Sequence, residues 1–432
     1  MHYTNKNALV VGLGKSGVAV AKKLAFLGAS VRVTDRADRS AIDPANIREL
    51  EALGIKLELG DPDLSVLGDA QLVVLSPGVP TSVRLVIEAW RRGIPVISEV
   101  EFAWRFLKKP IIAITGTNGK TTTTTLIGEF LKAAGKKAAV AGNIGYPLVL
   151  VNDNFLDFIV VELSSYQLET IKTFRPWISV ILNLSEDHLA RHKSMQAYAN
   201  AKARIFMNQG KTDYLIYNGD DPLVSAMVKD AAARLIPFSK KHFSGLDPSS
   251  IRLKGEHNLE NILAASSAAS LAGVSRQVIE NVLREFAGVE HRIEFVKIVN
   301  GISFYNDSKA TNPDSTIVAL RALRKEGQLI LILGGEDKGT DIRPMCEFIK
   351  RSVKHVVLLG SSIRRFKEAL EEAGYTGFSG VASMEEAVLK AYYSAAKGDI
   401  VLLSPACASF DMFKNFEERG KVFKEKVNAL AG

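Results

Sequence analysis

Cysteine is scarce in this sequence, since the 432 residues contain only Cys346 and Cys407. The two lie far apart without metal-like spacing, so neither a disulfide framework nor a zinc site is supported, and we interpret both as buried thiols. No apolar run approaches the length of a membrane span, and the chain begins without a cleavable signal pattern. We therefore expect a cytoplasmic protein with no membrane partner.

Dense basic tracts are also missing. The chain carries 55 Lys and Arg residues against 47 Asp and Glu, which gives a formal net charge of +8. These cations occur in ones and twos and are not interleaved with aromatic residues, so we expect no nucleic-acid partner. Scattered surface charge together with phosphate-binding sites accounts for the basic balance. With 47% hydrophobic and 24% charged residues, the composition is that of a folded globular chain.

Short apolar runs alternate with helical patterns along the whole chain, which predicts parallel α/β sheets. ALVVGLG at 8–14 opens the first series, IIAITGTNGKT at 111–121 the second, and GVEHRIE at 288–294 the third. We predict an α/β fold with three successive domains: 1–98, 99–288 and 289–432. The first and third are expected to be Rossmann-like, and the central one to be of the P-loop ATPase type.

A glycine-rich turn follows the first predicted strand. It reads GLGKSG at 12–17, and Asp35 ends the next strand, 18 residues after Gly17. Such glycines let the backbone approach a diphosphate closely, and an acidic residue at this place can meet a ribose hydroxyl. The motif alone is weak, because glycines at such turns are often only structural. A nicotinamide cofactor and the diphosphate of a nucleotide-linked substrate both remain open.

A second glycine turn, GTNGKT at 116–121, resembles a phosphate loop that is too short. The generic loop would need a glycine at position 114, which is Ile114. The remaining order of strand, tight turn and helix still places backbone N–H groups at a helix N-terminus, where they stabilise phosphate oxygens. Lys120 would add a charge against the β- and γ-phosphates, and Thr121 would ligate magnesium. ATP is the ligand that this pattern favours.

Polar side chains follow the next two apolar runs. Glu162 ends one run, and Asn183, Glu186, Asp187 and His188 follow the other. Open α/β sheets place their ligands at this carboxyl edge, where a carboxylate can hold Mg²⁺ or orient its water. Each residue alone could be a helix cap or a surface group, but their repeated placement favours a shared site.

Together these motifs resemble the Mur ligases, ATP-dependent amide-forming enzymes of peptidoglycan precursor synthesis, whose phosphate turn is characteristically short. The resemblance covers essentially the whole chain. Its motifs are GLGKSG at 12–17, LSPGVP at 75–80, GTNGKT at 116–121, GNIG at 142–145, ELSSYQLE at 162–169, NDSKATNPDST at 306–316, GGEDKG at 334–339 and LLSPACASFDMFKNFEERG at 402–420.

The resemblance is strongest to the D-glutamate-adding member of the family. It implies ATP-dependent ligation of D-glutamate to UDP-N-acetylmuramoyl-L-alanine through an acyl phosphate, with ADP and phosphate as products. It also implies ATP and two Mg²⁺ ions as cofactors and a monomeric enzyme. The first domain would bind the UDP-linked substrate, the second ATP and the third the amino acid. The glycine turn then holds the uridine diphosphate and not a nicotinamide cofactor.

The resemblance also assigns roles to individual residues. Those implied to bind ATP are Gly116, Thr117, Asn118, Gly119, Lys120, Thr121, Thr122, Asn258, Asn261, Arg292 and Asp307. Those implied to contact the UDP-linked substrate are Gly14, Lys15, Ser16, Asp35, Arg36, Ser76, Asn143 and Gln167. The implied D-glutamate pocket comprises Lys309, Thr311, Lys338, Ser409 and Phe416. Catalytic roles fall to Lys120, Asn143, His188 and Lys202. Implied metal ligands are Thr121, Glu162, His188 and Lys202, the last as a carbamate formed with CO₂.

Two departures from the family pattern stand out. The family commonly has a carboxylate in the second position after EDH, where this chain has Ala190, and the segment 213–256 is short.

Three alternatives remain at this stage. A related ligase such as a folylpolyglutamate synthase would use folate and L-glutamate. An NAD-dependent oxidoreductase would bind a nicotinamide cofactor at GLGKSG, and a non-catalytic nucleotide-binding regulator would retain its activity after Lys120→Ala.

Overall fold

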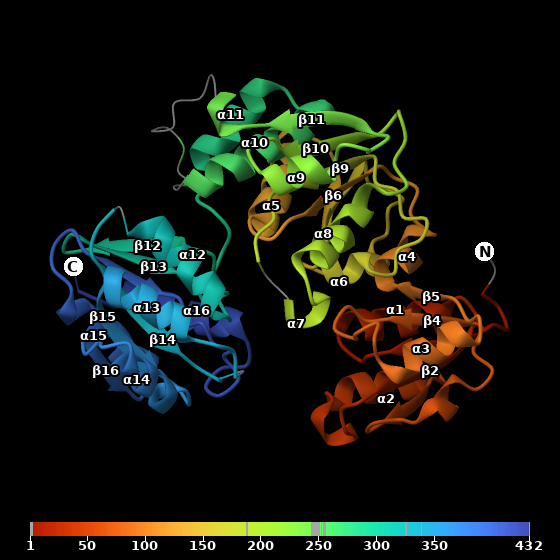
Figure 1. Ribbon diagram of the computed structural model, residues 1–432, viewed down its shortest axis with the longest axis horizontal. Coiled ribbons are helices and arrows are strands. Elements are labelled where there is room, and N and C mark those ends of the chain that lie inside the picture. The colour runs from red at the N-terminus through yellow and green to blue at the C-terminus, as the bar shows by residue number, and fades with distance from the viewer. Residues whose placement is uncertain are drawn as a thin grey trace. The chain divides into compact units, whose positions relative to one another are not determined.

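The computed structural model describes residues 3–186, 189–242, 251, 253, 256–324, 326–337 and 339–431. The chain folds into two compact units. The first comprises Met1–Leu246 with Asn258–Val282, and the second Asp247–His257 with Leu283–Gly432. Each unit is built from the alternating strands and helices that the sequence predicts (Figure 1).

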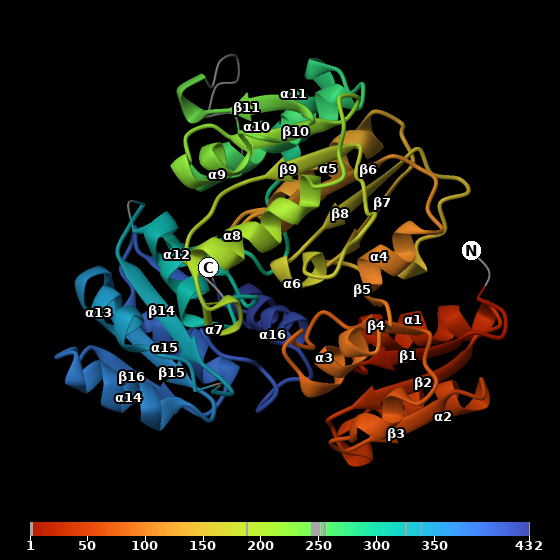
Figure 2. The ribbon, with the colours of Figure 1, turned by 45° about the vertical axis from the view of Figure 1, so that its right-hand side comes forward.

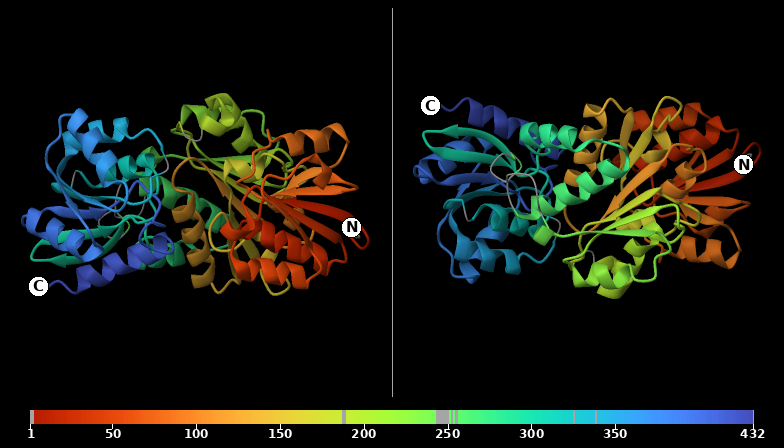
Figure 3. Two further views of the ribbon diagram at one scale, coloured as in Figure 1. Left: turned by 90° about the horizontal axis from the view of Figure 1, so that it is seen from below. Right: turned by 90° about the horizontal axis from the view of Figure 1, so that it is seen from above.

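The N-terminal part of the first unit is a parallel sheet in the strand order β3-β2-β1-β4-β5. Its strands are β1 Asn7–Val11, β2 Ser30–Asp35, β3 Lys56–Leu59, β4 Leu72–Leu75 and β5 Val96–Ser98. The helices between and after them are α1 Lys15–Phe26, η1 Arg39–Ala41, α2 Pro44–Ala52, η2 Leu64–Leu67, α3 Arg84–Arg91 and α4 Glu99–Trp104. Figure 3 shows the red and orange strands side by side, with helices on both faces of the sheet. Because both faces are covered, β1 and β4 are apolar and buried almost throughout.

A second parallel sheet has the strand order β11-β10-β9-β6-β8-β7. Its strands are β6 Ile111–Thr115, β7 Ala138–Gly142, β8 Phe158–Glu162, β9 Ile178–Ile181, β10 Tyr214–Asn218 and β11 Arg234–Phe238. Its helices are α5 Lys120–Ala133, η3 Leu148–Leu150, α6 Ser165–Leu168, α7 Leu189–His192, α8 Met195–Ala203, η4 Arg204–Phe206, α9 Pro222–Met227, η5 Lys240–His242, α10 Glu256–Leu271 and α11 Arg276–Glu285. The short α6 packs against α8 (Figure 2).

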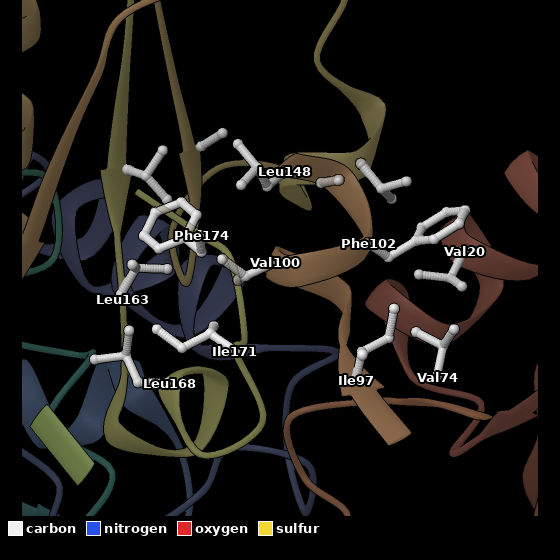
Figure 4. Close-up of a cluster of buried hydrophobic side chains, with 14 of the residues drawn as sticks. Val20, Val74, Ile97, Val100, Phe102, Leu148, Leu163, Leu168, Ile171 and Phe174 are labelled. Atoms are coloured by element: carbon white, nitrogen blue, oxygen red, sulfur yellow. The ribbon is translucent and has the colours of Figure 1, made fainter. Parts of the chain in front are cut away.

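One hydrophobic core joins the first two sheets. Helix α4 lies between them, and its two apolar faces point in opposite directions (Figure 4). Phe102 lies toward Val20 of α1, and Val100 lies toward Phe174, which follows α6 in the chain. These side chains are fully or almost fully buried. Since each such side chain contributes roughly 1.5–3 kcal/mol on burial, this core stabilises the two sheets as one unit.

The second unit contains the third sheet, in the strand order β12-β13-β17-β14-β15-β16. Its strands are β12 Glu294–Val299, β13 Ile302–Asn306, β14 Leu329–Gly334, β15 Val353–Leu359, β16 Phe378–Val381 and β17 Ile400–Leu403. Its helices are α12 Pro313–Leu323, α13 Arg343–Ser352, α14 Ile363–Glu372, α15 Met384–Ser394 and α16 Phe416–Asn428. The pairing of β12 with β13 is antiparallel, and the other pairings are parallel.

The topology places the sequence motifs at functional edges. In the first sheet the strand order changes direction at β1 and β4, whose carboxyl ends carry GLGKSG and LSPGVP. In the second sheet β6 lies between β8 and β9, so the phosphate loop is flanked by the segments after Glu162 and Ile181. Such edges are where parallel α/β sheets bind their ligands.

The α/β fold with three successive sheets confirms the fold predicted from the sequence. The domain limits 1–98, 99–288 and 289–432 stay predictions. Both cysteines are buried free thiols, as interpreted. Among the helices that the structure describes, none combines the length and the apolar character needed to cross a bilayer.

Candidate active site

The phosphate loop joins β6 to α5 with two residues that must be glycine. Gly116 and Gly119 have φ angles of 149° and 84°, in the region that other residues rarely adopt. A Cβ atom on Gly116 would lie 2.9 Å from Leu182 Cβ, and one on Gly119 would lie 2.0 Å from Asn261 Oδ1. The backbone therefore makes a tight turn directly into the N-terminus of α5, which is a suitable place for phosphate.

The segment after β9 braces this loop. The Asn183 side chain accepts a hydrogen bond from the Asn118 backbone N–H at 2.8 Å and donates one to the Asn118 carbonyl at 3.2 Å. The Thr117 hydroxyl accepts a hydrogen bond from the Ser185 N–H at 3.1 Å and lies 3.2 Å from the Tyr198 hydroxyl. The apolar run before Asn183 predicted its place at this edge, but Tyr198, which lies on α8, was not predicted.

Two lysine side chains converge on the loop. Lys120 Nζ donates to the carbonyl oxygens of Gly116 and Thr117, at 2.9 and 2.7 Å. Lys202 Nζ donates to the same Gly116 carbonyl at 2.8 Å and lies 4.5 Å from the centroid of the Tyr198 ring. Lys202 is 1% exposed. Two lysine side chains therefore meet at the N-terminus of α5, and the charge of Lys120 there favours a polyphosphate.

Two buried oxygens beside the loop fit a magnesium ion. Thr121 Oγ1 and one carboxylate oxygen of Glu162 have no hydrogen-bond partner among the described residues. Glu162 ends β8, which pairs with β6 in a register that sets it opposite Ile114, directly before the loop. A buried polar atom without a partner is costly, and hydroxyl and carboxylate oxygens are ligands that Mg²⁺ prefers. The residues present therefore fit Mg²⁺.

Asn143 lies against the same carboxylate. Its side-chain amide donates to Glu162 Oε1 at 2.7 Å, and its backbone N–H donates to the Glu162 carbonyl at 2.9 Å. The preceding Gly142 has a φ of 103°, which turns the chain sharply after β7. The structure thus brings Asn143 and Glu162 together, and their roles stay predictions.

Helix α10 places Asn261 against the loop and Asn258 beside Asn261. Asn261 donates to Asn258 Oδ1 at 3.0 Å, which agrees with the predicted i,i+3 helix face. The Thr123 hydroxyl of α5 also donates to Asn261 Oδ1, at 3.4 Å. Asn261 is therefore a close neighbour of Gly119, besides any contact that it makes with a nucleotide base.

The glycine turn of the first sheet is equally tight. A Cβ atom on Gly17 would lie 1.9 Å from the Gly12 carbonyl oxygen, so the backbone of α1 lies against the turn and a side chain at position 17 would not fit. The Ser76 hydroxyl, from the loop after β4, donates to that same carbonyl at 2.8 Å. Gly14 is the N-cap of α1 and is exposed. The predicted contacts Lys15 and Ser16 begin this helix, so the turn presents a helix N-terminus suited to a diphosphate.

The Asp35 side chain forms hydrogen bonds with the backbone that were not predicted from the sequence. One carboxylate oxygen accepts from the Leu13 N–H at 2.5 Å, and the other accepts from the Ala37 N–H at 2.8 Å. The carboxylate thereby holds the glycine turn to the end of β2. The next residue, Arg36, is exposed and lies 3.8 Å from Asp61.

The predicted substrate contact Gln167 is almost entirely buried. It forms a capping box with Ser164, accepting from the Ser164 N–H at 3.0 Å and donating its own N–H to the Ser164 hydroxyl at 3.3 Å. This box starts α6 immediately after β8. Gln167 therefore shapes the ELSSYQLE segment and has 2% of its surface exposed.

In the second unit, Asp307 is buried at the end of β13. Its carboxylate accepts from the Ser404 hydroxyl at 2.8 Å and from the Ile293 N–H at 3.2 Å. Burial raises the pKa of Asp307 to about 7, against the lowering effects of these hydrogen bonds and of the Arg292 charge. Arg292 itself is exposed. Hydrogen bonds to the Asp307 carboxylate thus connect the end of β13 with the end of β17.

The segments that carry the predicted amino-acid-binding residues meet at a residue that was not predicted from the sequence. Arg419 of α16 is 2% exposed. Its guanidinium donates to the Ser308 carbonyl and hydroxyl, at 2.8 and 3.0 Å, and to the carbonyls of Cys407 and Ala408, at 3.1 and 3.0 Å. It therefore ties together the segments that carry Lys309 and Ser409. The arginine in the motif NFEERG is the sequence signal that could have pointed to this anchor. A buried arginine needs several fixed acceptors, and these carbonyl and hydroxyl groups supply them.

The other predicted pocket residues lie on the same segments. Phe416 begins α16, and its carbonyl accepts from the Ser308 hydroxyl at 2.8 Å. Lys309 Nζ lies 5.6 Å from the centroid of the Phe416 ring, and Thr311 donates its N–H to the Lys309 carbonyl. Two further predictions, for His188 and Lys338, lie outside the described residues.

Within the described part of the chain, the acidic cluster Glu290, His291 and Glu294 has ligand-like spacing. Lys424 Nζ donates to both of its carboxylates, at 2.5 and 2.9 Å. The amine thus neutralises the pair. Burial also lowers the pKa of His291, against the raising effect of the two glutamates. We therefore interpret the cluster as an ion-pair network that packs α16 onto β12.

Comparison with known proteins decides which family this arrangement represents. Three family models match along the chain: the Mur ligase MurD-like, N-terminal domain at residues 6–98, the Mur ligase middle domain at 114–269, and the Mur ligase, glutamate ligase domain at 291–407. The chain belongs to the Mur ligase family. Mur ligases are ATP-dependent, so ATP and Mg²⁺ are in general terms the cofactors of this Mur ligase.

Curated relatives match this Mur ligase from end to end. The UDP-N-acetylmuramoylalanine--D-glutamate ligase of Thermoanaerobacter pseudethanolicus is 46% identical, with 100% of both chains covered. The enzyme of the same name from Caldanaerobacter subterraneus subsp. tengcongensis is also 46% identical, with the same coverage. Among solved structures, UDP-N-acetylmuramate-alanine ligase from Thermotoga maritima has a TM-score of 0.59 at 20% identity, covering 98% of this chain and 99% of that one. At that identity the structural match shows the fold alone.

Proposed function

We propose that this Mur ligase joins D-glutamate to UDP-N-acetylmuramoyl-L-alanine in peptidoglycan precursor biosynthesis, with ADP and phosphate as products. The relatives at 46% identity over the whole chain carry that activity in their names. The observation that carries the chemistry is the edge of the second sheet, where the side chains of Lys120 and Lys202 and two buried oxygens without a partner among the described residues lie beside one phosphate loop.

The first step activates an inert acid. A carboxylate is a poor acyl donor, because attack by an amine would have to expel oxide. Transfer of the γ-phosphoryl group of ATP to the terminal L-alanine carboxylate gives an acyl phosphate and ADP. Lys120 and the N–H groups at the start of α5 offset the charge repulsion between the two anions.

Thr121 and Glu162 would hold one Mg²⁺ ion, and Lys202, as a carbamate, would support a second together with His188. Bound magnesium neutralises charge on the transferring phosphoryl group and orients it toward the carboxylate. Asn143, which donates to Glu162, would keep this carboxylate oriented and face the reacting groups.

The second step forms the amide. The amino group of D-glutamate adds to the acyl phosphate, and the tetrahedral intermediate expels phosphate while the amine loses a proton. In the second unit, Lys309, Thr311, Lys338, Ser409 and Phe416 would form the amino-acid pocket, with cations and hydroxyls that match two carboxylates. Arg292 and Asp307 would reach the nucleotide, which requires closure of the third domain onto the second.

The proposal includes a monomeric enzyme acting in the cytoplasm. ATP and a UDP-linked sugar are both cytoplasmic metabolites, and the first domain would hold the UDP moiety at GLGKSG through Gly14, Lys15, Ser16, Asp35, Arg36 and Ser76.

An amino-acid panel tests the function. Purified enzyme with ATP, Mg²⁺ and UDP-N-acetylmuramoyl-L-alanine should release phosphate with D-glutamate, and not with L-glutamate or L-lysine. A control with folate and L-glutamate should be silent. Faster phosphate release with any other amino acid would refute the D-glutamate assignment, and absence of ADP with every amine would refute the ligase itself.

A further inference from the structure

Arg191 forms a largely buried ion pair on α7, the helix that follows the segment bracing the phosphate loop. Its Nε and Nη2 donate to the two oxygens of Glu169, at 3.2 and 2.6 Å. The two side chains are only 14% and 13% exposed. The guanidinium carbon also lies 4.6 Å from the centroid of the Tyr166 ring. Helix α7 is thereby fastened to the ELSSYQLE segment that follows β8.

The same guanidinium reaches the first sheet. Arg191 Nη2 donates to the backbone carbonyl of Val79 at 3.0 Å, across 112 positions of the chain. Val79 belongs to the loop LSPGVP after β4, and its N–H donates to the Ser76 carbonyl at 3.0 Å. Arg191 is thus one side chain that contacts both a segment of the ATP-binding sheet and a loop of the sheet that would bind UDP.

The contacted loop packs directly on the glycine turn. A Cβ atom on Gly12 would lie 2.8 Å from a Val79 methyl group and 2.8 Å from Ser76 Cβ. The Ser76 hydroxyl donates to the Gly12 carbonyl. A shift of the loop at Val79 would therefore displace the backbone at Gly12, because close-packed groups transmit small displacements.

From these contacts we propose that Arg191 is a positioning residue. It fixes the glycine turn and the LSPGVP loop of the first sheet against the edge of the second sheet that carries the two oxygens fitting magnesium. The inference rests on the proposed ligase function. It assigns Arg191 the task of setting the distance between the UDP anchor and the phosphate loop, so that the terminal carboxylate of the substrate reaches the γ-phosphate. A substrate held at one end by UDP and attacked at the other depends on that distance.

Arginine suits this task better than lysine does. Its planar fork binds both oxygens of Glu169 and still has an N–H for the Val79 carbonyl, while its face lies on an aromatic ring. The neighbouring His192 supports the arrangement, since its Nε2 lies 2.9 Å from the Ser165 hydroxyl and its ring stacks on Tyr166. Lysine would supply the charge without the bidentate geometry.

Steady-state kinetics of Arg191→Met and Arg191→Lys test the inference. We expect kcat/KM for the UDP-linked substrate to fall by about 10- to 100-fold in Arg191→Met, with partial recovery in Arg191→Lys. The KM for ATP should stay within about twofold, because the contacts of Arg191 with described residues include no predicted ATP ligand. Arg175→Met is the matched control. It also removes an arginine from an ion pair of this unit, with Asp213 at 2.8 Å, but contacts neither turn.

Hydrogen–deuterium exchange supplies a second measurement that does not depend on turnover. Arg191→Met should speed exchange at residues 76–83, and Arg175→Met should not. Unchanged exchange there, or an unchanged kcat/KM for the UDP-linked substrate, overturns the inference while the wild-type ligase activity still stands. A wild-type enzyme that makes no ADP with D-glutamate refutes the proposed function instead, and it refutes the substrate-positioning role with it.

Discussion

The ammonium group of Lys202 donates a hydrogen bond to the carbonyl oxygen of Gly116, at 2.8 Å and across 86 positions of the chain. This contact places a helix α8 lysine at the first residue of the phosphate loop. The proposed carbamate of Lys202 would therefore form beside the loop that leads to Thr121. The lysine that looks ordinary in the sequence is thus part of the predicted centre.

Removal of CO₂ should lower the rate of the wild-type enzyme, because Lys202 would lose its carbamate and with it a metal ligand. Lys202→Met should be slower by at least about 10- to 100-fold, the usual cost of disturbing a metal's surroundings. Phosphate release in degassed buffer, with and without added bicarbonate, measures this. A bicarbonate response that persists in Lys202→Met would contradict the assignment.

Gly119→Ala should abolish tight ATP binding. The new methyl group would have to displace Asn261, whose Oδ1 lies 2.0 Å from its position, in a backbone with φ of 84°. Gly135→Ala is the matched control at the other end of α5, with φ of 73° and no atom within 4 Å of the added carbon. It should cost about 1 kcal/mol of stability and leave the KM for ATP unchanged. Equal ATP affinities in the two variants would contradict this prediction.

Thr121→Ala and Glu162→Gln should raise the Mg²⁺ concentration needed for half-maximal rate. Each change removes an oxygen that has no partner among the described residues, so the expected loss is of metal affinity and not of a protein hydrogen bond. Glu129→Gln, a change at a half-exposed glutamate of α5, is the control. Titration of the initial rate with Mg²⁺ measures this concentration for each variant. Curves identical to that of the wild type would show that Thr121 and Glu162 do not bind the metal.

Glu99 should make stability depend on pH. It is buried between the first two sheets, accepts from the Val149 N–H at 2.7 Å, and its other oxygen has no partner among the described residues. Burial raises its pKa from 4.5 to about 7. The neutral form is therefore favoured on folding, so this stabilisation is complete below about pH 4.5 and is lost as the pH rises through 7.

Glu99→Gln should consequently gain stability relative to the wild type between pH 5 and 8, by an amount on the order of 3 kcal/mol at most. Melting temperatures of both proteins over that range measure the difference. Comparing the two proteins cancels the effect of Asp307, whose pKa is also raised to about 7 by burial. A difference that is independent of pH would show that Glu99 does not titrate in this range.

Arg419→Lys should weaken amino-acid binding more than nucleotide binding. Lysine cannot reach Ser308, Cys407 and Ala408 together, so the segments that carry Lys309 and Ser409 would lose their common anchor. We expect the KM for D-glutamate to rise by about tenfold or more while the KM for the UDP-linked substrate is unchanged. Arg364→Lys, at an exposed ion pair of α14, is the control. Parallel increases in both constants would indicate general damage.

The fold and the family were predictable because their signals are local. Alternating apolar runs predicted three α/β sheets, and the structure and the comparisons confirm this fold and the Mur ligase family. Gly116, Gly119 and Lys120 stand within five positions, so the order of strand, tight turn and helix around them could be predicted from the sequence. The spacing of Asn258 and Asn261 likewise predicted their shared helix face.

Only the tertiary structure decided how the distant segments meet. No spacing rule connects Lys202 with Gly116, Arg191 with Val79, or Arg419 with Ser308, because the chain between the partners can follow many paths. The amino-acid sequence by itself determined the strands, the glycine turns and the charged groups. Packing of the strands into sheets then selected which of those groups share a site, since hydrogen bonds and ion pairs act over a few ångströms of space and not along the chain.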